Sequence, residues 1–501
     1  MRPLAPITLE IVVLLLGIFL ICAECLVRRE DKRWMATTSI FVLAVVFAWS
    51  FFTTGNTGVD LLNSFYSADA KALFFKRIAL LTTMVVLVMA IEYRGVLSKY
   101  IPGGTPGGGT AEFYAVPVLT CAGLMFMASA IDFVLIFVSL ELVTISFYIL
   151  VAYMRRHPAS LEAGVKYLIL SALSTGFLVY GITWIFGVTG ETNLLKIGAK
   201  LPSVLAGSEA AVLFGFMLVL IAIGFKIAAV PFQLWVPDVY QGAPTPVTAF
   251  LSVGSKAAGF IVLLRVVEPF VAIPQLSSKI IAVLVILAAL SLVYGNLAAM
   301  PQDNLKRLLA YSSIAHAGYL LVAVASIGPA ASSFGSSGVA VAFYLAGYLL
   351  MTLLSFLILI VVANHSRGDD ILHFNGLARR SPFLAFGMLI AMLSLAGVPF
   401  TAGFIGKFLV FAAAVQQQQF LLVVLGIITV AAGFYYYLRI VAAMYWQAPN
   451  ETNRITLSPL TGFTIGALTF ALLFFGVFPG PLLNMLHDAP PVPRPALSAA
   501  H

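Results

Sequence analysis

The sequence is dominated by apolar stretches of about twenty residues, the length that an α-helix needs to cross the hydrocarbon core of a bilayer. Fourteen such stretches follow one another with short polar linkers and leave no separate soluble domain. Hydrophobic residues make up 61% of the 501 residues and charged residues only 10%, which excludes a water-soluble enzyme. We therefore expect an all-α polytopic membrane protein. Its apolar segments lie at approximately 7–27, 36–54, 76–96, 112–130, 132–154, 162–188, 209–241, 243–272, 279–299, 302–327, 335–364, 382–417, 419–446 and 458–480.

The basic residues between these segments predict the orientation of the chain. Linkers from odd to even segments carry more Lys and Arg than linkers on the other face, so the positive-inside rule places both termini on the periplasmic side. The first apolar run follows Arg2 without a cleavage site of small residues after it, which indicates a retained helix and not a signal peptide. The net charge of +8 is scattered among the linkers, which argues against binding of nucleic acid.

Cysteine is too sparse for a metal centre built on thiolates. The chain has only Cys22, Cys25 and Cys121, so a four-cysteine iron–sulfur or zinc site is excluded, and redox chemistry is expected on other chains. Cys22 and Cys25 have C-x-x-C spacing but end an apolar segment, and we interpret them as packing residues.

Four charged residues stand alone deep inside apolar segments: Glu141, Lys226, Lys256 and Lys407. A charge at the centre of a membrane helix costs about 2.5–3.5 kcal/mol on insertion scales, so such residues are first interpreted as functional. Lys407 is the clearest case, because residues 382–406 and 408–438 contain no Asp, Glu, Lys or Arg. Metal binding is not expected, because ammonium groups are not ligands and only one of the four is a carboxylate.

Three further polar residues have two interpretations each. Lys166 could belong to the same functional set, or it could form an i,i+4 ion pair with Glu162 near a helix end. His316 could be a packed histidine or a proton relay. Asp132 is interpreted as the start of a helix.

A glutamate and several lysines inside a bilayer form a set of switchable proton sites. A buried lysine can release its proton, and a nearby carboxylate restores its affinity for one. A change in the distance between Glu141 and a lysine would therefore move protons, and a row of such sites linked by water would pass them on. The sequence thus predicts that the chain moves protons. A structural bundle or a pocket for an apolar ligand would explain the buried charges less well.

Two of the charged segments also contain helix breakers. Val230-Pro231-Phe232 follows Lys226, and Val398-Pro399-Phe400 precedes Lys407. A proline at membrane depth frees a backbone carbonyl and is tolerated inside protein or beside a water-filled path. The interrupted segments are the seventh and twelfth, which predicts two inverted five-helix repeats, segments four to eight and nine to thirteen.

Several long motifs resemble the antiporter-like subunits of respiratory complex I, the proton-translocating NADH:quinone oxidoreductase, and the subunit N branch (subunit 2) in particular. They are FKIAAVPFQLWVPDVYQGAPTPV at 225–247, TAFLSVGSKAAG at 248–259, NLKRLLAYSSIAHAGY at 304–319 and LAGVPFTAGFIGK at 395–407. The resemblance extends over most of the chain.

This resemblance implies a fourteen-helix subunit of the membrane arm, in the bacterial inner membrane, that translocates protons and holds no cofactor. The proton-transfer roles of that family would fall on Glu141, Lys166, Lys226, Lys256 and Lys407. Glu141 and Lys226 would form the coupled pair, Lys166 would modulate it, Lys256 would be the central relay and Lys407 the exit-side donor.

The resemblance also implies partners and cofactors on other chains. The partners would be the neighbouring antiporter-like subunit M, the small subunits K and J, the lateral helix of subunit L and the lipid bilayer. FMN and iron–sulfur clusters would lie on other subunits. We expect the chain to lack the long lateral helix of subunit L and to carry only a proline-rich tail from Ala489 to His501.

The sequence divides into four expected regions. Residues 1–111 form a three-helix segment with a Gly/Pro-rich loop. Residues 112–272 and 273–446 form the two repeats, and residues 447–501 form the last helix and the tail.

The sequence leaves rival hypotheses for the function. A subunit of a multi-subunit cation/proton antiporter or of a membrane-bound hydrogenase would share the lysines and broken helices. A solute transporter would need polar groups beside the breaks, and a scaffold would not need the five charges formed by the four isolated residues and Lys166.

Overall fold

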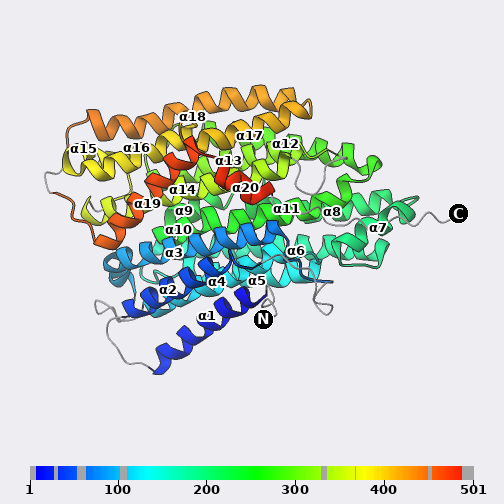
Figure 1. Ribbon diagram of the computed structural model, residues 1–501, viewed down its shortest axis with the longest axis horizontal. Helices are drawn as coiled ribbons and strands as arrows, with labels where there is room; N and C mark the ends of the chain where they lie inside the picture. The colour runs from blue at the N-terminus through cyan, green and yellow to red at the C-terminus, as the bar shows by residue number, and fades with distance from the viewer. Residues whose placement is uncertain are drawn as a thin grey trace.

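The chain is a bundle of long helices. The computed structural model describes residues 7–26, 32–53, 64–101, 110–328, 336–366, 368–449 and 454–487, and no β-strand occurs within these ranges. The helices run roughly side by side, with α1 and α2 along one edge and α18 along the opposite edge (Figure 1). The expected Gly/Pro-rich loop at 102–109 and the tail from Ala489 lie outside the described residues.

Each of the fourteen predicted segments corresponds to helix in the structure, which confirms the polytopic all-α fold. Twelve helical stretches in the described part are long and apolar enough to cross a membrane. The other two segments are α2, of 17 residues, and the pair α16 and α17, of 15 residues each. The twelve are α1 (Thr8–Leu26), α3 (Ala70–Tyr100), α4 (Ala111–Ser129), α5 (Phe133–Val151), α6 (Pro158–Thr189), α8 (Glu209–Ile227), α10 to α11 (Thr245–Val271), α12 (Pro274–Ala299), α13 (Leu305–Ala325), α14 (Ser336–Ser366), α18 (Phe420–Trp446) and α19 (Pro459–Val477).

Shorter elements complete the chain. They are α2 (Arg33–Trp49), α7 (Leu194–Val204), α9 (Val236–Gly242), η2 (Ile371–Phe374), α15 (Leu377–Arg380), α16 (Pro382–Ala396), α17 (Ala402–Gln416) and α20 (Gly480–His487). Helix α7 was not predicted, because its eleven residues are too few and too polar for a span. Its apolar side, Leu194, Ile197 and Leu201, is buried in the protein.

Polar residues fix several helix starts. Asp69 accepts a hydrogen bond from the Ala72 amide at the start of α3, and Asn304 accepts one from Arg307 at the start of α13. Asp132 caps α5 through the Val134 amide, as the sequence predicted.

The polar centre of the bundle lies on helices that other helices surround. In α13 every residue from Leu305 to Ala325 except Arg307 is buried. Helices α12 and α13 approach closely at Gly295, where an added Cβ would lie 2.5 Å from the backbone nitrogen of Ala315. Such small residues let membrane helices come into backbone contact. By contrast, Cys22 and Cys25 are exposed on α1 and are not packed inside, which corrects the expectation for them.

Two of the spanning segments are interrupted. Helix α8 ends at Ile227, and the chain runs through Pro231 before α9 begins at Val236. Helix α16 ends at Ala396, and Pro399 lies in the stretch before α17. Both interruptions place backbone groups without helical partners at the centre of the bundle.

An even number of crossings puts the start of α1 and the end of α19 on one face of the bundle. We name this the terminal face. The opposite face, where α2 begins and α3 ends, is the one that the loop residues predict to be richer in Lys and Arg, and we name it the cationic face.

Candidate functional site

The first polar cluster joins helices α5, α6 and α8. Thr175 donates a hydrogen bond of 2.7 Å to the Glu141 carboxylate. The Lys226 ammonium contacts the hydroxyl of Thr144 and lies 3.5 Å from that of Ser171. Because Thr144 is one turn from Glu141, and Ser171 one turn from Thr175, the hydroxyls lie between the two charges. No direct ion pair joins Glu141 to Lys226 among the described residues.

Lys166 lies apart from this cluster, at the cationic end of α6. Its Nζ is 2.7 Å from Glu162 Oε1 and 2.7 Å from Asp238 Oδ2, and 42% of its side chain is exposed. Asp238 is also 3.1 Å from Arg307. The i,i+4 pair that the sequence offered as an alternative is therefore present, and Lys166 contacts carboxylates and not Lys226.

The second cluster surrounds Lys256, the first residue of α11. It follows a turn of π-helix, η1 (Leu251–Ser255), a local widening that is frequent at functional sites. The Lys256 ammonium donates to the backbone oxygen and to the hydroxyl of Ser313 on α13. That hydroxyl also lies 3.2 Å from the Tyr240 hydroxyl and accepts from Tyr348 at 3.0 Å. Ser313 thus connects α9, α11, α13 and α14.

His316 lies one turn beyond Ser313 and is almost completely buried. Its Nδ1 is 2.7 Å from the Tyr344 hydroxyl, and its Nε2 is 3.1 Å from the Tyr437 hydroxyl. Both ring nitrogens of His316 therefore have a hydrogen-bond partner, as a packed histidine requires. The same two contacts connect the imidazole to Tyr344 on one side and to Tyr437 on the other, as a proton relay requires. Tyr348 lies between the two basic groups, with Lys256 5.4 Å and the imidazole 5.1 Å from its ring centre.

The third cluster is built at the second helix interruption. The Lys407 ammonium donates to the carbonyl oxygens of Leu395 and Ala396, at 2.9 and 2.8 Å. These are the carbonyls that the end of α16 leaves without helical partners, and the negative end of a helix favours a cation. Tyr319 stands between Lys407 and His316, with the ammonium 5.0 Å from its ring.

The sequence missed the hydroxyl partners of these charges. A hydroxyl in an apolar helix usually bonds to the backbone of its own helix, so the sequence does not mark it as functional. This applies to Thr144, Ser171, Thr175 and Ser313. The available signal is their spacing, since Thr144 lies three residues after Glu141 and Ser313 lies three residues before His316.

The sequence also missed a separate ionic cluster on the terminal face. Lys76, the first residue of the third expected segment, lies inside α3, 2.7 Å from Glu10 of α1, and both side chains are fully buried. The Tyr66 hydroxyl donates to Glu10 at 3.0 Å and accepts from Lys76 at 2.7 Å. Arg265 lies in α11 and pairs with Asp69 at 2.8 Å.

The chemistry available at the three central clusters is proton binding and transfer. Lys226, Lys256 and Lys407 have at most 6% of their surface exposed, and hydroxyls or carbonyls are their hydrogen-bond partners. Within the described ranges no three His, Cys, Asp or Glu side chains come together as a metal site would require.

Comparison with known proteins assigns this arrangement to a class. Residues 130–433 match the family model of the NADH:quinone oxidoreductase/Mrp antiporter transmembrane proteins. The fold alone is shared with a chain of the Mrp complex from Dietzia, at 19% identity and a TM-score of 0.78, with 96% of each chain covered.

Closer relatives narrow the class. NADH-quinone oxidoreductase subunit N of Desulforamulus reducens is 38% identical over 97% of this chain and 98% of its own length. The subunit N of Trichlorobacter lovleyi is 40% identical over 88% of this chain and 87% of its own length. A chain of respiratory complex I from Thermus thermophilus matches with a TM-score of 0.78 and 32% identity over 96% of this chain and 100% of that chain. The chain belongs to the NADH-quinone oxidoreductase subunit N family, which confirms the resemblance found in the motifs.

Proposed function

We propose that this chain is a proton-translocating membrane subunit of an NADH:quinone oxidoreductase. It moves protons across the membrane while quinone is reduced elsewhere in the complex. The observation that carries the proposal is the row of three buried lysines that have no carboxylate ion pair among the described residues. A charged ammonium held by hydroxyls and carbonyls alone is costly in a bilayer, and such residues mark ion pathways.

The proposed roles follow the contacts of each residue. Glu141 and Lys226 form the coupled pair, and Thr144, Ser171 and Thr175 hold the two charges without joining them directly. A small movement of α5 against α8 would therefore change how strongly the carboxylate favours the ammonium. Because hydroxyl rotors can turn, such a change needs no large displacement.

Lys256 is the proposed central relay. It passes a proton through the Ser313 hydroxyl, which accepts from Tyr348, toward His316, whose two ring nitrogens each face a tyrosine hydroxyl. Between Lys226 and Lys256 no hydrogen-bonded chain of described side chains runs, so water carries the proton there. Lys407, on the carbonyls of the second interruption, is the proposed exit-side donor.

Lys166 is proposed to act through Asp238, which it shares with Arg307. Asp238 lies on α9, directly after the first helix interruption. The ion pair therefore ties α6 to α9, the continuation of the interrupted helix, and Lys166 would modulate the coupled pair at a distance.

The wider setting of the chain is also proposed. It lies in a bacterial inner membrane with both termini on the periplasmic side, beside subunits M, K and J and the lateral helix of subunit L. The chain itself holds no cofactor, and FMN and iron–sulfur clusters belong to other subunits. Residues 112–272 and 273–446 form inverted repeats, because each contains one interrupted helix in the corresponding place; residues 1–111 and 447–501 flank them.

The test is isolation of the particle that contains the chain. The chain is tagged at its C-terminus, expressed at its native level and extracted in mild detergent. The mass of the purified particle and its donor-driven quinone reduction are then measured. We expect a large assembly that reduces quinone. Recovery of the chain alone, or in a particle with cation/proton antiport or hydrogenase activity and no quinone reduction, would contradict the proposal.

A further inference from the structure

Tyr167 of α6 carries a buried hydroxyl that no contact in the described structure explains. The side chain has no exposed surface, and among the described residues no atom forms a hydrogen bond with its hydroxyl. A buried tyrosine hydroxyl normally has a partner, because burial without one costs free energy that a phenylalanine at the same place would not cost. The hydroxyl therefore has a role other than packing.

The position of Tyr167 along α6 places it between the cationic face and Lys226. Helix α6 begins at that face. Lys166, the residue before Tyr167, is still 42% exposed and is paired with Asp238. Ser171, one turn further into the bundle than Tyr167, lies 3.5 Å from the Lys226 ammonium. Because long side chains on a helix lean toward its N-terminus, the phenol lies on the cationic side of Ser171. A proton that enters from the cationic face thus meets Tyr167 before it meets Lys226.

Aromatic rings close the space around Tyr167. Its ring centre lies 5.1 Å from that of Trp235, 5.6 Å from that of Tyr148 and 6.3 Å from that of Phe225. Trp235 and Phe225 lie on the two sides of the first helix interruption, and the Trp235 indole donates to the Phe225 carbonyl oxygen at 3.0 Å. The indole N–H of this layer therefore has a partner, whereas the equally buried Tyr167 hydroxyl has none among the described residues. That hydroxyl is the group of the layer that can take up a passing proton.

The Lys226 ammonium is close to this phenol. Its Nζ lies 5.7 Å from the centre of the Tyr167 ring, while the hydroxyls of Thr144 and Ser171 hold it on the side of Glu141. Water commonly bridges polar groups that are too far apart for a direct hydrogen bond. The phenol and the ammonium are therefore near enough to exchange a proton without a large movement of either helix.

We propose that the Tyr167 hydroxyl is the relay through which protons from the cationic face reach Lys226. The assignment rests on the proposed function, since it adds an entry point to the same proton path. A proton from water on the cationic side bonds to the phenol oxygen, and the original O–H proton leaves for the deprotonated Lys226 amine, where a new N–H bond forms. Tyr167 ends as the neutral phenol with which it began, so the step needs no oxidant, reductant or other co-reactant.

The test removes the hydroxyl and keeps the ring. Tyr167→Phe in the complex retains the aromatic layer and deletes no hydrogen bond of the described residues. We expect proteoliposomes of the variant complex to pump protons at least about tenfold more slowly, because proton transfer by a positioned side chain contributes about 10²–10⁴-fold to a rate. The purified variant chain should unfold at the same SDS fraction as the wild type or at a higher one, because its hydroxyl loses no partner.

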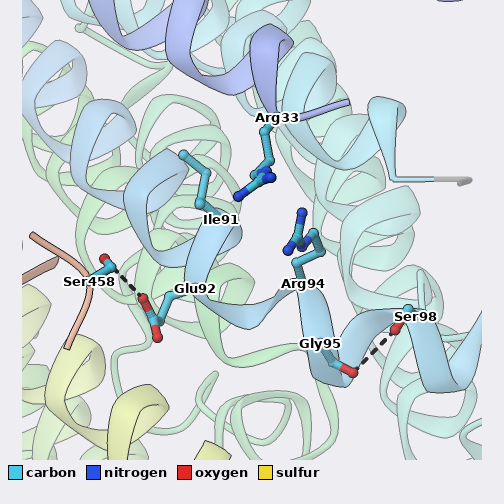
Figure 2. Close-up of a pocket in the computed structure, with 7 residues that line it drawn as sticks. All are labelled: Arg33, Ile91, Glu92, Arg94, Gly95, Ser98 and Ser458. Carbon is cyan, nitrogen blue, oxygen red and sulfur yellow. Dashed lines mark hydrogen bonds between the residues drawn. The ribbon is translucent and has the colours of Figure 1, made fainter. Parts of the chain in front are cut away.

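The matched control is Tyr93→Phe, which also deletes one buried hydroxyl. Tyr93 is 7% exposed, and its hydroxyl contacts Met154 Sδ at 3.8 Å. It stands between Glu92 and Arg94 on the stretch of α3 that Figure 2 shows, in a helix that the proposed path does not use. Tyr93→Phe should therefore pump protons like the wild type.

Three outcomes would overturn the assignment: wild-type pumping by Tyr167→Phe, an equal loss of pumping in Tyr93→Phe, or a loss of stability in Tyr167→Phe, which would make the hydroxyl structural. Lys226→Ala, measured alongside, separates this failure from failure of the proposed function. If Lys226→Ala stops pumping while Tyr167→Phe pumps normally, the entry relay is wrong and the proton path stands. If neither variant changes pumping, the proposed function fails as well.

Discussion

Replacing Lys76 with methionine should destabilise the protein more than any surface change. Lys76 Nζ lies 2.7 Å from Glu10 Oε1, and neither side chain has any exposed surface. Coulomb's law gives about 6 kcal/mol of attraction at this distance with an effective dielectric constant of about 20. Removal of one partner leaves a buried carboxylate whose remaining partners are the hydroxyls of Tyr66 and Ser129.

Desolvation in the folded state offsets part of that attraction, so the expected loss in free energy of unfolding is about 3–5 kcal/mol. The double variant Glu10→Gln with Lys76→Met removes both charges and keeps an acceptor for the Tyr66 hydroxyl. It should recover to within about 1 kcal/mol of the wild type, because a buried pair is often replaceable by uncharged groups of similar volume.

The measurement is unfolding of the purified full chain by SDS in mixed micelles, followed by tryptophan fluorescence. We expect strong coupling between the two substitutions, with the double variant more stable than Lys76→Met alone. A loss below about 1 kcal/mol for Lys76→Met, or a double variant whose loss equals the sum of the single losses, would refute it.

Two further predictions concern contacts between distant helices. Ser313→Ala should slow proton pumping by proteoliposomes of the complex roughly tenfold, since a buried hydrogen bond to a charged group is worth about 1.5–3 kcal/mol; Ser355→Ala, whose hydroxyl bonds only within its own helix, is the control and should not change the rate. Burial raises the pKa of the Asp69 carboxyl, but Arg265 at 2.8 Å outweighs this and holds the pKa below its ordinary value. The ionised pair therefore stabilises the fold above about pH 4 and loses its effect as the pH falls through the pKa of the folded state. The stability difference between wild type and Arg265→Gln should shrink over that range in SDS unfolding, and a constant difference would contradict the assignment.

The apolar segments and the interruptions were predictable because lipid leaves few alternatives. A helix is the one way to satisfy twenty successive backbone groups in a bilayer without a barrel, and the two prolines lie where helices stop. The isolated charges were equally visible, since Glu141 and Lys407 interrupt long uncharged runs.

The partners of those charges depend on tertiary contacts that no local pattern contains. Ser313 and Lys256 are 57 residues apart, and only the packing of α13 on α11 brings them together. Lys76 stands at the very start of the expected apolar run 76–96, where a charge is unremarkable, whereas α3 starts six residues earlier, at Ala70, and buries it against Glu10. A sequence window that scores hydropathy cannot recognise a charge whose cost is offset by a partner on another helix.

The central claim is that protons pass through the buried lysines of this chain. It is tested most directly by the number of protons pumped per quinone reduced, in proteoliposomes of the complex that carries Lys226→Ala. The control is Lys279→Ala, an exposed lysine paired with Glu209 on the terminal face. We expect Lys226→Ala to pump fewer protons per quinone reduced, or to lose both proton pumping and quinone reduction. The control should pump protons and reduce quinone like the wild type. Unchanged pumping and unchanged quinone reduction in Lys226→Ala would contradict it.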